Sequence, residues 1–282
     1  MDRFLSMIPI IDESEIKHNN IEIICPIVDN IEVDARTKEM IRSKIKDVGI
    51  EKVLKAHRIG YACVNTSLNI PTNKTCRLDN CSDARLRSLI SSNLDGMKKI
   101  IEWNIENGIN LYRISSVVIP YASHEINKIP WWEEYKVAIS DIGKIIKNSG
   151  IRVSMHPGQY VNINSPDKNV VDFSIKELEY HAKFMDLLGL DSTHRMILHI
   201  GGAYGNKDGS IKRFIDVWST LSDNIKTRLT IENDDKTYNV WDVLKVSSMT
   251  ELPVIFDILH HQINHDNTAK DKGLNYILDQ CC

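Results

Sequence analysis

Histidine and carboxylate side chains follow a series of short apolar segments in the second half of the chain. The five that best suit metal binding are His156, His199, Glu232, Asp257 and His260. Imidazole and carboxylate groups bind divalent metals, and metal pairs ~3.5–4 Å apart activate water for phosphodiester cleavage. One such histidine alone more often has a structural, hydrogen-bonded role. Their recurrence after successive apolar segments favours a metal site, in which His261 is an alternative to His260.

The elements that must position these side chains are predicted from apolar segments and helical periodicity. A stripe of apolar residues predicts a helix over 83–107, with Gly108 as its C-terminal stop. A second helix is predicted to begin at Ser174, which forms a capping box with Glu177, and to end before Gly189. Six apolar segments have the length and the polar or glycine ends of buried strands. These predicted strands are 59–65, 111–116, 152–158, 196–202, 228–234 and 252–258.

The alternation of strands and helices predicts an α/β fold with parallel strands and right-handed crossovers. Either an open doubly wound sheet or a closed barrel satisfies this pattern. A barrel brings all carboxyl ends of its strands to one mouth, whereas an open sheet usually has a glycine-rich phosphate-binding turn, which does not follow 59–65. We therefore predict a TIM-like barrel. Six of its eight strands are recognisable, so we expect an incomplete barrel.

Length and composition predict one main domain. A barrel of ~250 residues would account for most of the 282 residues, and we assign it to 56–282. Residues 1–55 are expected to form a mainly helical N-terminal extension with an amphipathic helix at 34–48. The formal net charge of −3 excludes binding of nucleic acid through bulk positive charge and requires a local basic patch. Six cysteines without a CxxC pair, no signal-like start and no run of 18 apolar residues predict an intracellular protein without a membrane partner.

Seven segments between residues 58 and 265 resemble the signature blocks of the UV damage endonuclease family in order and spacing. They read GYACVN, RISS, HPGQY, LHIGG, KDGSIKRF, IENDD and FDILHH. The resemblance implies a TIM-like barrel that holds two or three divalent ions, commonly Mn²⁺, with Zn²⁺ or Mg²⁺ as alternatives. It also implies an enzyme that nicks double-stranded DNA on the 5′ side of UV photoproducts and other distorting lesions.

The same resemblance implies roles for particular residues. His156, His199, Glu232, Asp257 and His260 correspond to metal ligands, and Glu232 to the carboxylate that bridges two ions. His124 is expected to join Glu232 as a catalytic group.

Residues for lesion capture follow from the same comparison. Gln159 and Tyr160 correspond to a pair that enters the duplex where damaged bases leave the stack. An amide and an aromatic face can replace lost pairing and stacking, and unstacking costs least at a lesion. The alternative is a tyrosine that packs on the barrel rim. Tyr61 and Asn65 resemble family residues that reach the lesion and the phosphate.

A local basic patch is predicted shortly after the fourth strand. It consists of Lys207, Lys212 and Arg213, which are suited to phosphate contacts. Exposed charges that only keep the protein soluble would have the same sequence pattern.

The sequence departs from the family after FDILHH, where about twenty residues remain. Family members continue with two strands that bring a Lys-x-His motif, another histidine and a glutamate to the metals. We therefore expect the site of His156, His199 and Glu232 to be usable and the further metal positions to be weak, with poor nicking by this chain. Either the N-terminal extension or a second chain would cover the gap, or the sequence is a fragment.

Two other functions are compatible with the same sequence. Sugar isomerases and epimerases also hold divalent metals with histidine, glutamate and aspartate at barrel strand ends, although they do not need an inserted Gln-Tyr pair or a basic loop. A degenerate protein that binds damaged DNA without cleaving it is the second alternative. Nicking of a duplex with one photoproduct in Mn²⁺ would separate these from the repair enzyme.

Overall fold

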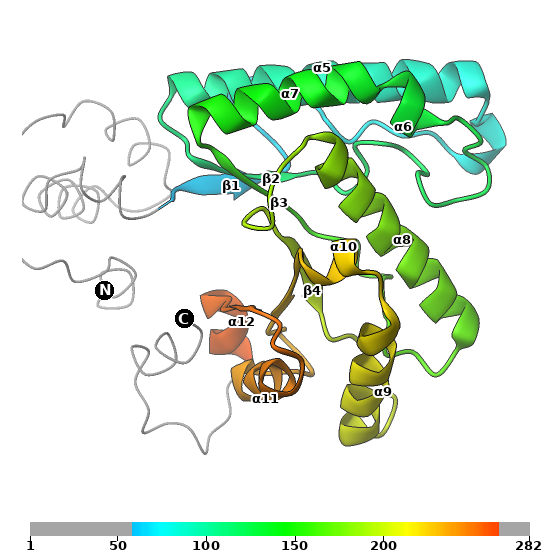
Figure 1. The fold of residues 1–282 in the computed structure, drawn as a ribbon, viewed down its shortest axis with the longest axis vertical. Helices are drawn as coiled ribbons and strands as arrows, with labels where there is room; N and C mark the ends of the chain where they lie inside the picture. Colours follow the sequence, from blue (N-terminus) through cyan, green and yellow to red (C-terminus); the bar gives the residue numbers. More distant parts are fainter. Residues whose placement is uncertain (1–57, 265–282) are drawn as a thin grey trace, which may run out of the picture.

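The computed structural model describes residues 58–264 of the chain. Its centre is a sheet of six parallel strands in the order β1-β2-β3-β4-β5-β6, so neighbours in the sequence are neighbours in the sheet (Figure 1). The predicted extension 1–55 and its helix at 34–48 lie outside the described residues. The strands are β1 (Gly60–Ala62), β2 (Leu111–Ile114), β3 (Arg152–Met155), β4 (Met196–His199), β5 (Leu229–Glu232) and β6 (Val254–Ile255).

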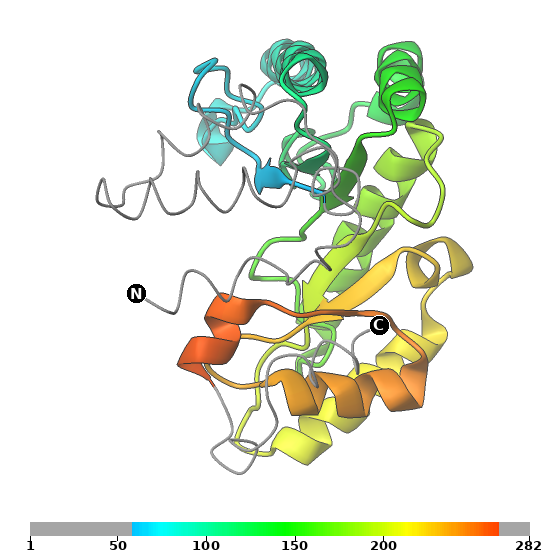
Figure 2. The ribbon, with the colours of Figure 1, turned by 90° about the vertical axis from the view of Figure 1, so that its left-hand side faces the viewer.

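Helices lie in an arc around the strands. Figures 1 and 2 show α5 beside α7 at one end of the arc and α9 beside α11 at the other, with α8 between them. This is the predicted barrel architecture in its incomplete form, a half-barrel of six strands. Within residues 58–264, no helix has the length and apolar composition needed to cross a membrane. The helical elements are η2 (Leu78–Asn80), α5 (Asp83–Glu106), α6 (Trp131–Glu134), α7 (Lys136–Ser149), α8 (Lys168–Leu187), α9 (Lys207–Thr220), α10 (Asp223–Lys226), α11 (Val240–Thr250) and α12 (Ile258–Ile263).

The strands have two faces with different surroundings. Alternate residues of a strand point to opposite sides of the sheet. One set, the helix face, includes Tyr112, Val153, Met196 and Leu229, which are buried in the main core together with apolar residues of the surrounding helices. The other set is the interior face of the half-barrel. In β3, β4 and β5 it includes Ser154, Ile197, His199, Thr230 and Glu232, none of which belongs to that core cluster.

Both predicted helices exist, but one begins earlier than predicted. α5 begins after Ser82, whose hydroxyl accepts a hydrogen bond from the Arg85 backbone N–H. α8 begins at Lys168 instead of Ser174, because the Asp167 carboxylate accepts the Asn169 backbone N–H and caps the helix. The capping box predicted at Ser174 is therefore wrong. Ser174 is buried inside α8, where its hydroxyl donates to the Val170 carbonyl and accepts from the Asn162 backbone N–H.

Candidate metal centre

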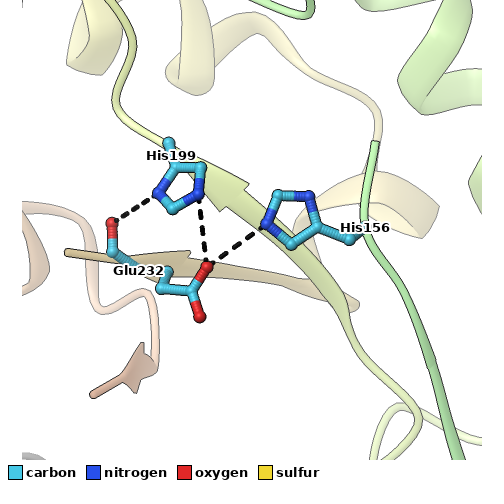
Figure 3. Close-up of side chains that lie close together, drawn as sticks. All are labelled: His156, His199 and Glu232. Atoms are coloured by element: carbon cyan, nitrogen blue, oxygen red, sulfur yellow. Dashed lines mark hydrogen bonds and ion pairs between the residues drawn. The ribbon is translucent and has the colours of Figure 1, made fainter. Parts of the chain in front are cut away.

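Three of the predicted ligands converge at the carboxyl ends of β3, β4 and β5. His199 and Glu232 are the last residues of their strands and are paired in register, and His156 directly follows β3. The Glu232 Oε2 atom lies 3.2 Å from His156 Nε2 and 3.4 Å from His199 Nε2. Figure 3 shows both imidazole rings directed at this carboxylate. The three candidate ligand atoms all lie within 4.8 Å of one another, so one cation could contact all three.

The hydrogen bonds of the two rings fix which nitrogen faces the site. His156 Nδ1 lies 2.9 Å from the Pro157 carbonyl oxygen, and His199 Nδ1 lies 3.4 Å from the Glu232 carbonyl oxygen. A carbonyl oxygen only accepts, so Nδ1 carries the proton in each neutral ring and Nε2 presents its lone pair. Burial lowers the pKa of His199, and the Glu232 carboxylate offsets part of this effect, so the ring is neutral at pH 7.

This arrangement fits a metal ion by the chemistry of its donor atoms. Two imidazole lone pairs and a carboxylate oxygen face one another within the distances above, and none of these atoms brings a hydrogen to the contact when both rings are neutral. A shared proton or a cation is needed to make the arrangement favourable. Glu232 is 7% exposed, which makes unscreened lone-pair repulsion costly. Histidine rings held through Nδ1 by backbone carbonyls are typical of metal ligands.

Asp257 and His260 lie next to this group. Asp257 caps the short helix α12 by accepting the His260 backbone N–H, and its Oδ2 atom is 3.9 Å from His260 Nε2. The His260 ring packs edge-on against His199, with 5.5 Å between the ring centroids, whereas His261 packs on Phe256. Of the two alternatives, His260 therefore lies beside the metal-binding candidates. Neither Asp257 nor His260 joins the compact group of three among the described residues.

Two residues that sequence reasoning did not single out shape the chain next to the candidate ligands. The Asn233 side chain donates to the Asp257 carbonyl and accepts the Asp257 backbone N–H, at 2.9 and 2.8 Å, which ties the end of β5 to the start of α12. Asn233 is fully buried. Asp234 accepts the backbone N–H groups of Lys236, Thr237 and Tyr238 and so shapes the following loop. The only sequence signal for either was position within IENDD, immediately after Glu232.

His124 lies in the loop between β2 and α6, in contact with the Tyr121 ring. Its Nδ1 atom accepts the Ile126 backbone N–H at 3.0 Å. The proton of the neutral ring is therefore on Nε2, unlike in His156 and His199. His124 is not part of the group of three that converges within residues 58–264, and its catalytic role stays a prediction.

The Gln-Tyr pair predicted for lesion capture is at the surface beside the candidate ligands. Both residues are exposed, and Tyr160 is exposed to 73%. Gln159 lines a cavity together with His156 and His199, and Tyr160 lines a second cavity with Phe173 and Tyr180. Gln159 thus borders the candidate ligands, whereas the Tyr160 ring lines the neighbouring cavity; its exposure is compatible with contact to DNA and shows that it is not packed tightly on the rim.

Tyr61 and Asn65 are positioned differently from the candidate ligands. The Tyr61 ring lies on the helix face, packs on the core and donates from its hydroxyl to the Asn104 side chain of α5 at 2.7 Å. Asn65 is buried, donates to the Tyr61 hydroxyl and accepts the Leu68 backbone N–H. Their predicted contacts to lesion and phosphate stay predictions. In this structure their side chains bind the protein itself.

The predicted basic patch is largely paired within the protein. Lys207 forms an ion pair with Asp242 at 2.5 Å, and the Arg213 guanidinium donates to the Asn164 carbonyl and the Ser210 hydroxyl. Lys212 is exposed, and none of the ion pairs within the described residues includes it. Of the three predicted cations, only Lys212 is therefore free to contact a phosphate in this structure.

The fold and the site together define an α/β half-barrel with metal-type ligands at the carboxyl ends of its parallel strands. Comparison with known proteins then specifies the family. Residues 57–280 match the family of UV-endonuclease UvdE, and the chain belongs to this family.

Named relatives agree with this assignment. The chain is 47% identical over 217 residues to the UV DNA damage endonuclease of Clostridium perfringens, covering 77% of this chain and 53% of the relative. It is 34% identical over 219 residues to the UV-damage endonuclease of Schizosaccharomyces pombe, covering 73% of this chain and 36% of the relative. The crystal structure of SacUVDE is similar with a TM-score of 0.75 and 42% identity, covering 79% of this chain and 75% of that one. The chain thus spans about half the length of the first relative and about a third of the second.

Proposed function

We propose that this chain is a DNA repair endonuclease that nicks double-stranded DNA on the 5′ side of UV photoproducts and other distorting lesions inside the cell. The observation that carries the proposal is the convergence of His156, His199 and Glu232 in a member of the UV-endonuclease UvdE family. The curated relatives are themselves named for endonuclease action at UV damage.

The residues suit a divalent ion at this place. His156 and His199 would hold it through Nε2 and Glu232 through its carboxylate, and Asp257 and His260 would contribute ligands to a second ion. Such an ion, Mn²⁺ first and Zn²⁺ or Mg²⁺ as alternatives, would supply Lewis-acid polarisation of a phosphate and activation of water. The chain itself orients the ligands through Pro157, Asn233 and the backbone of Glu232.

The surface beside the ligands suits damaged DNA. Gln159 and Tyr160 are exposed on the loop that follows His156, so they would meet a duplex whose backbone lies at the metal centre. Insertion is easiest where a lesion has already weakened stacking, which makes these two side chains selectors of damage and not chemical groups.

The test is incision of an end-labelled duplex that contains one photoproduct, in Mn²⁺, with Glu232→Gln compared to the unmodified chain. We expect a weak nick on the 5′ side of the lesion, since the further metal positions lack part of the family's ligands, and its loss in Glu232→Gln, because the amide is a poorer metal ligand than the carboxylate. Glu179→Gln, an exposed change on α8, is the matched control and should retain the nick. Tight binding of the damaged duplex without any nick would select the non-catalytic alternative, and turnover of a ketose without DNA binding would contradict the proposal.

A further inference from the structure

A cavity at the candidate metal centre is lined in part by a lysine, Lys236, that was not among the residues of the basic patch predicted from sequence. The cavity has a volume of about 300 Å³, and its lining includes His156, His199, Gln159, Asn162, Asp235 and Lys236. Lys236 is exposed, and no ion pair within residues 58–264 includes its ammonium group. A lysine without an acidic partner in the same cavity as two candidate metal ligands is free to contact an anion.

We propose that Lys236 binds a backbone phosphate of the DNA strand that enters this cavity, next to the phosphate at the metal centre. This proposal rests on the proposed function, because it takes DNA as the ligand. It assigns to one loop, 234–238, the placement of the strand relative to His156, His199 and Glu232.

Hydrogen bonds within the loop hold the backbone from which the Lys236 side chain extends. The Asp234 carboxylate accepts three backbone N–H groups, from Lys236, Thr237 and Tyr238, at 2.8, 2.5 and 3.0 Å. The Asp234 backbone N–H donates to the Tyr238 carbonyl, and Asn264 donates to the Asp234 carbonyl. A preorganised loop loses little entropy when its lysine binds, which favours a contact of defined geometry.

The carboxylates around the cavity make a cation necessary for a phosphate to bind there. Asp234 lines the cavity, but its oxygens are occupied by backbone N–H groups, and Glu232 faces the two histidines. Asp235 remains, and an approaching phosphate would be repelled by it unless a cation lies nearby. Lys236 supplies that cation from the adjacent position in the chain.

The three cations predicted from sequence cannot do the same. Lys207 is held by Asp242 and Arg213 by the Asn164 carbonyl, and neither lines the cavity. Lys212 is exposed but lies outside the cavity as well. Lys99 on α5 is a matched control for Lys236, since both are exposed lysines without an ion pair among the described residues and Lys99 lies outside both the cavity and the predicted basic patch.

The experiment measures binding, so it does not depend on nicking. A fluorescent duplex with one photoproduct and its undamaged counterpart are titrated with the chain in chelator-containing buffer, between about 50 and 200 mM salt. We expect Lys236→Ala to weaken binding of both duplexes roughly tenfold, because a phosphate contact does not read the lesion. The slope of log affinity against log salt should fall by about 0.9, and Lys236→Arg should restore both values. Lys99→Ala should change neither.

An unchanged affinity and salt slope in Lys236→Ala would overturn the proposal, as would an equal loss in Lys99→Ala. The unmodified chain tests the proposed function separately, through its preference for damaged over undamaged duplex. Equal binding of both duplexes would contradict damage recognition, while the salt slope would still decide the role of Lys236. A chain that binds neither duplex would contradict both.

Discussion

The two histidines of the candidate metal centre are oriented by backbone carbonyls. Pro157 and Glu232 accept from the Nδ1 atoms of His156 and His199, so the rings turn their Nε2 lone pairs toward the same carboxylate oxygen. Sequence spacing predicted that these side chains would meet, because strands of one parallel sheet end at one edge. It could not predict the tautomers, since these depend on which carbonyl lies behind each ring.

The sequence also left open which side of the sheet each strand residue points to. A strand has a period of two, so a residue points either to the helices or to the interior of the half-barrel. Tyr61 points to the helices, where Asn104 accepts its hydroxyl hydrogen. The sequence also did not reveal that Lys207 is paired with Asp242 and Arg213 with the Asn164 carbonyl, because these partners are distant in the sequence.

His181 gives a prediction about pH. The ring is fully buried in α8, its Nδ1 donates to the Glu177 carbonyl at 2.7 Å, and its Nε2 has no hydrogen-bond partner among the described residues. Burial lowers the pKa of His181 to about 4, with a small further lowering from His156 and a partial offset from the bond to Glu177. The folded protein therefore holds this histidine neutral at pH values where the unfolded chain has already protonated it.

The sign of the effect follows from proton uptake. Between pH 6.5 and about 4 the unfolded state binds more protons than the folded state, so the free energy of unfolding falls as the pH falls. Below about pH 4 both states are protonated and the loss stops. The full loss is about 3 kcal/mol. Urea unfolding of the unmodified chain and His181→Leu at several pH values should show their difference changing by this order across the window. A pH-independent difference would contradict the assignment.

Among the elements, the strands were predicted more reliably than the helix ends. Each observed strand lies inside a predicted segment, and the segments extend further because their polar C-terminal residues leave the sheet to form the mouth. The helix over 83–107 was confirmed as α5. The predicted start of α8 was wrong, because the Ser174 and Glu177 pattern of a capping box also occurs in the interior of a helix. There the Ser174 hydroxyl donates to the Val170 carbonyl. Only the fold places the Asn162 backbone N–H within reach of that hydroxyl.

The start of α8 can be tested by removing its cap. Asp167→Ala should lower the free energy of unfolding by about 1 kcal/mol, because the Asn169 backbone N–H loses its acceptor. Glu179→Ala, an exposed change within the same helix, should have little effect and is the control. Chemical denaturation of the three chains provides the comparison. If Asp167→Ala and Glu179→Ala were equally stable, Asp167 would not be the cap.

At the scale of the whole molecule, the candidate metal centre joins three strands that are separated by long stretches of sequence. Because the three side chains meet only in the folded protein, a cation at this site would bind the folded state and not the unfolded chain. It should therefore stabilise the entire half-barrel. At a free concentration 100 times the dissociation constant, the gain is about 2.7 kcal/mol.

We therefore expect Mn²⁺ to raise the thermal unfolding midpoint in a concentration-dependent manner and a chelator to reverse the rise. Glu232→Gln should abolish most of this response, whereas Glu179→Gln should respond like the unmodified chain. Calorimetry or circular dichroism during heating measures the midpoints. A midpoint that Mn²⁺ does not move, in a chain that is otherwise folded, would argue against the site.

The sequential order of the six strands also allows the sheet to form from its N-terminal strand onward. Each strand pairs with the strand before it in the sequence, so each new strand and its helix can pack on the preceding ones during synthesis. Contacting residues are therefore closer in the sequence than in a parallel sheet with mixed strand order. The ligands, however, come from the ends of β3, β4 and β5. A nascent chain could thus bury much of its core while still lacking Glu232, and the capacity to hold a metal would arise late, after the scaffold around it already exists.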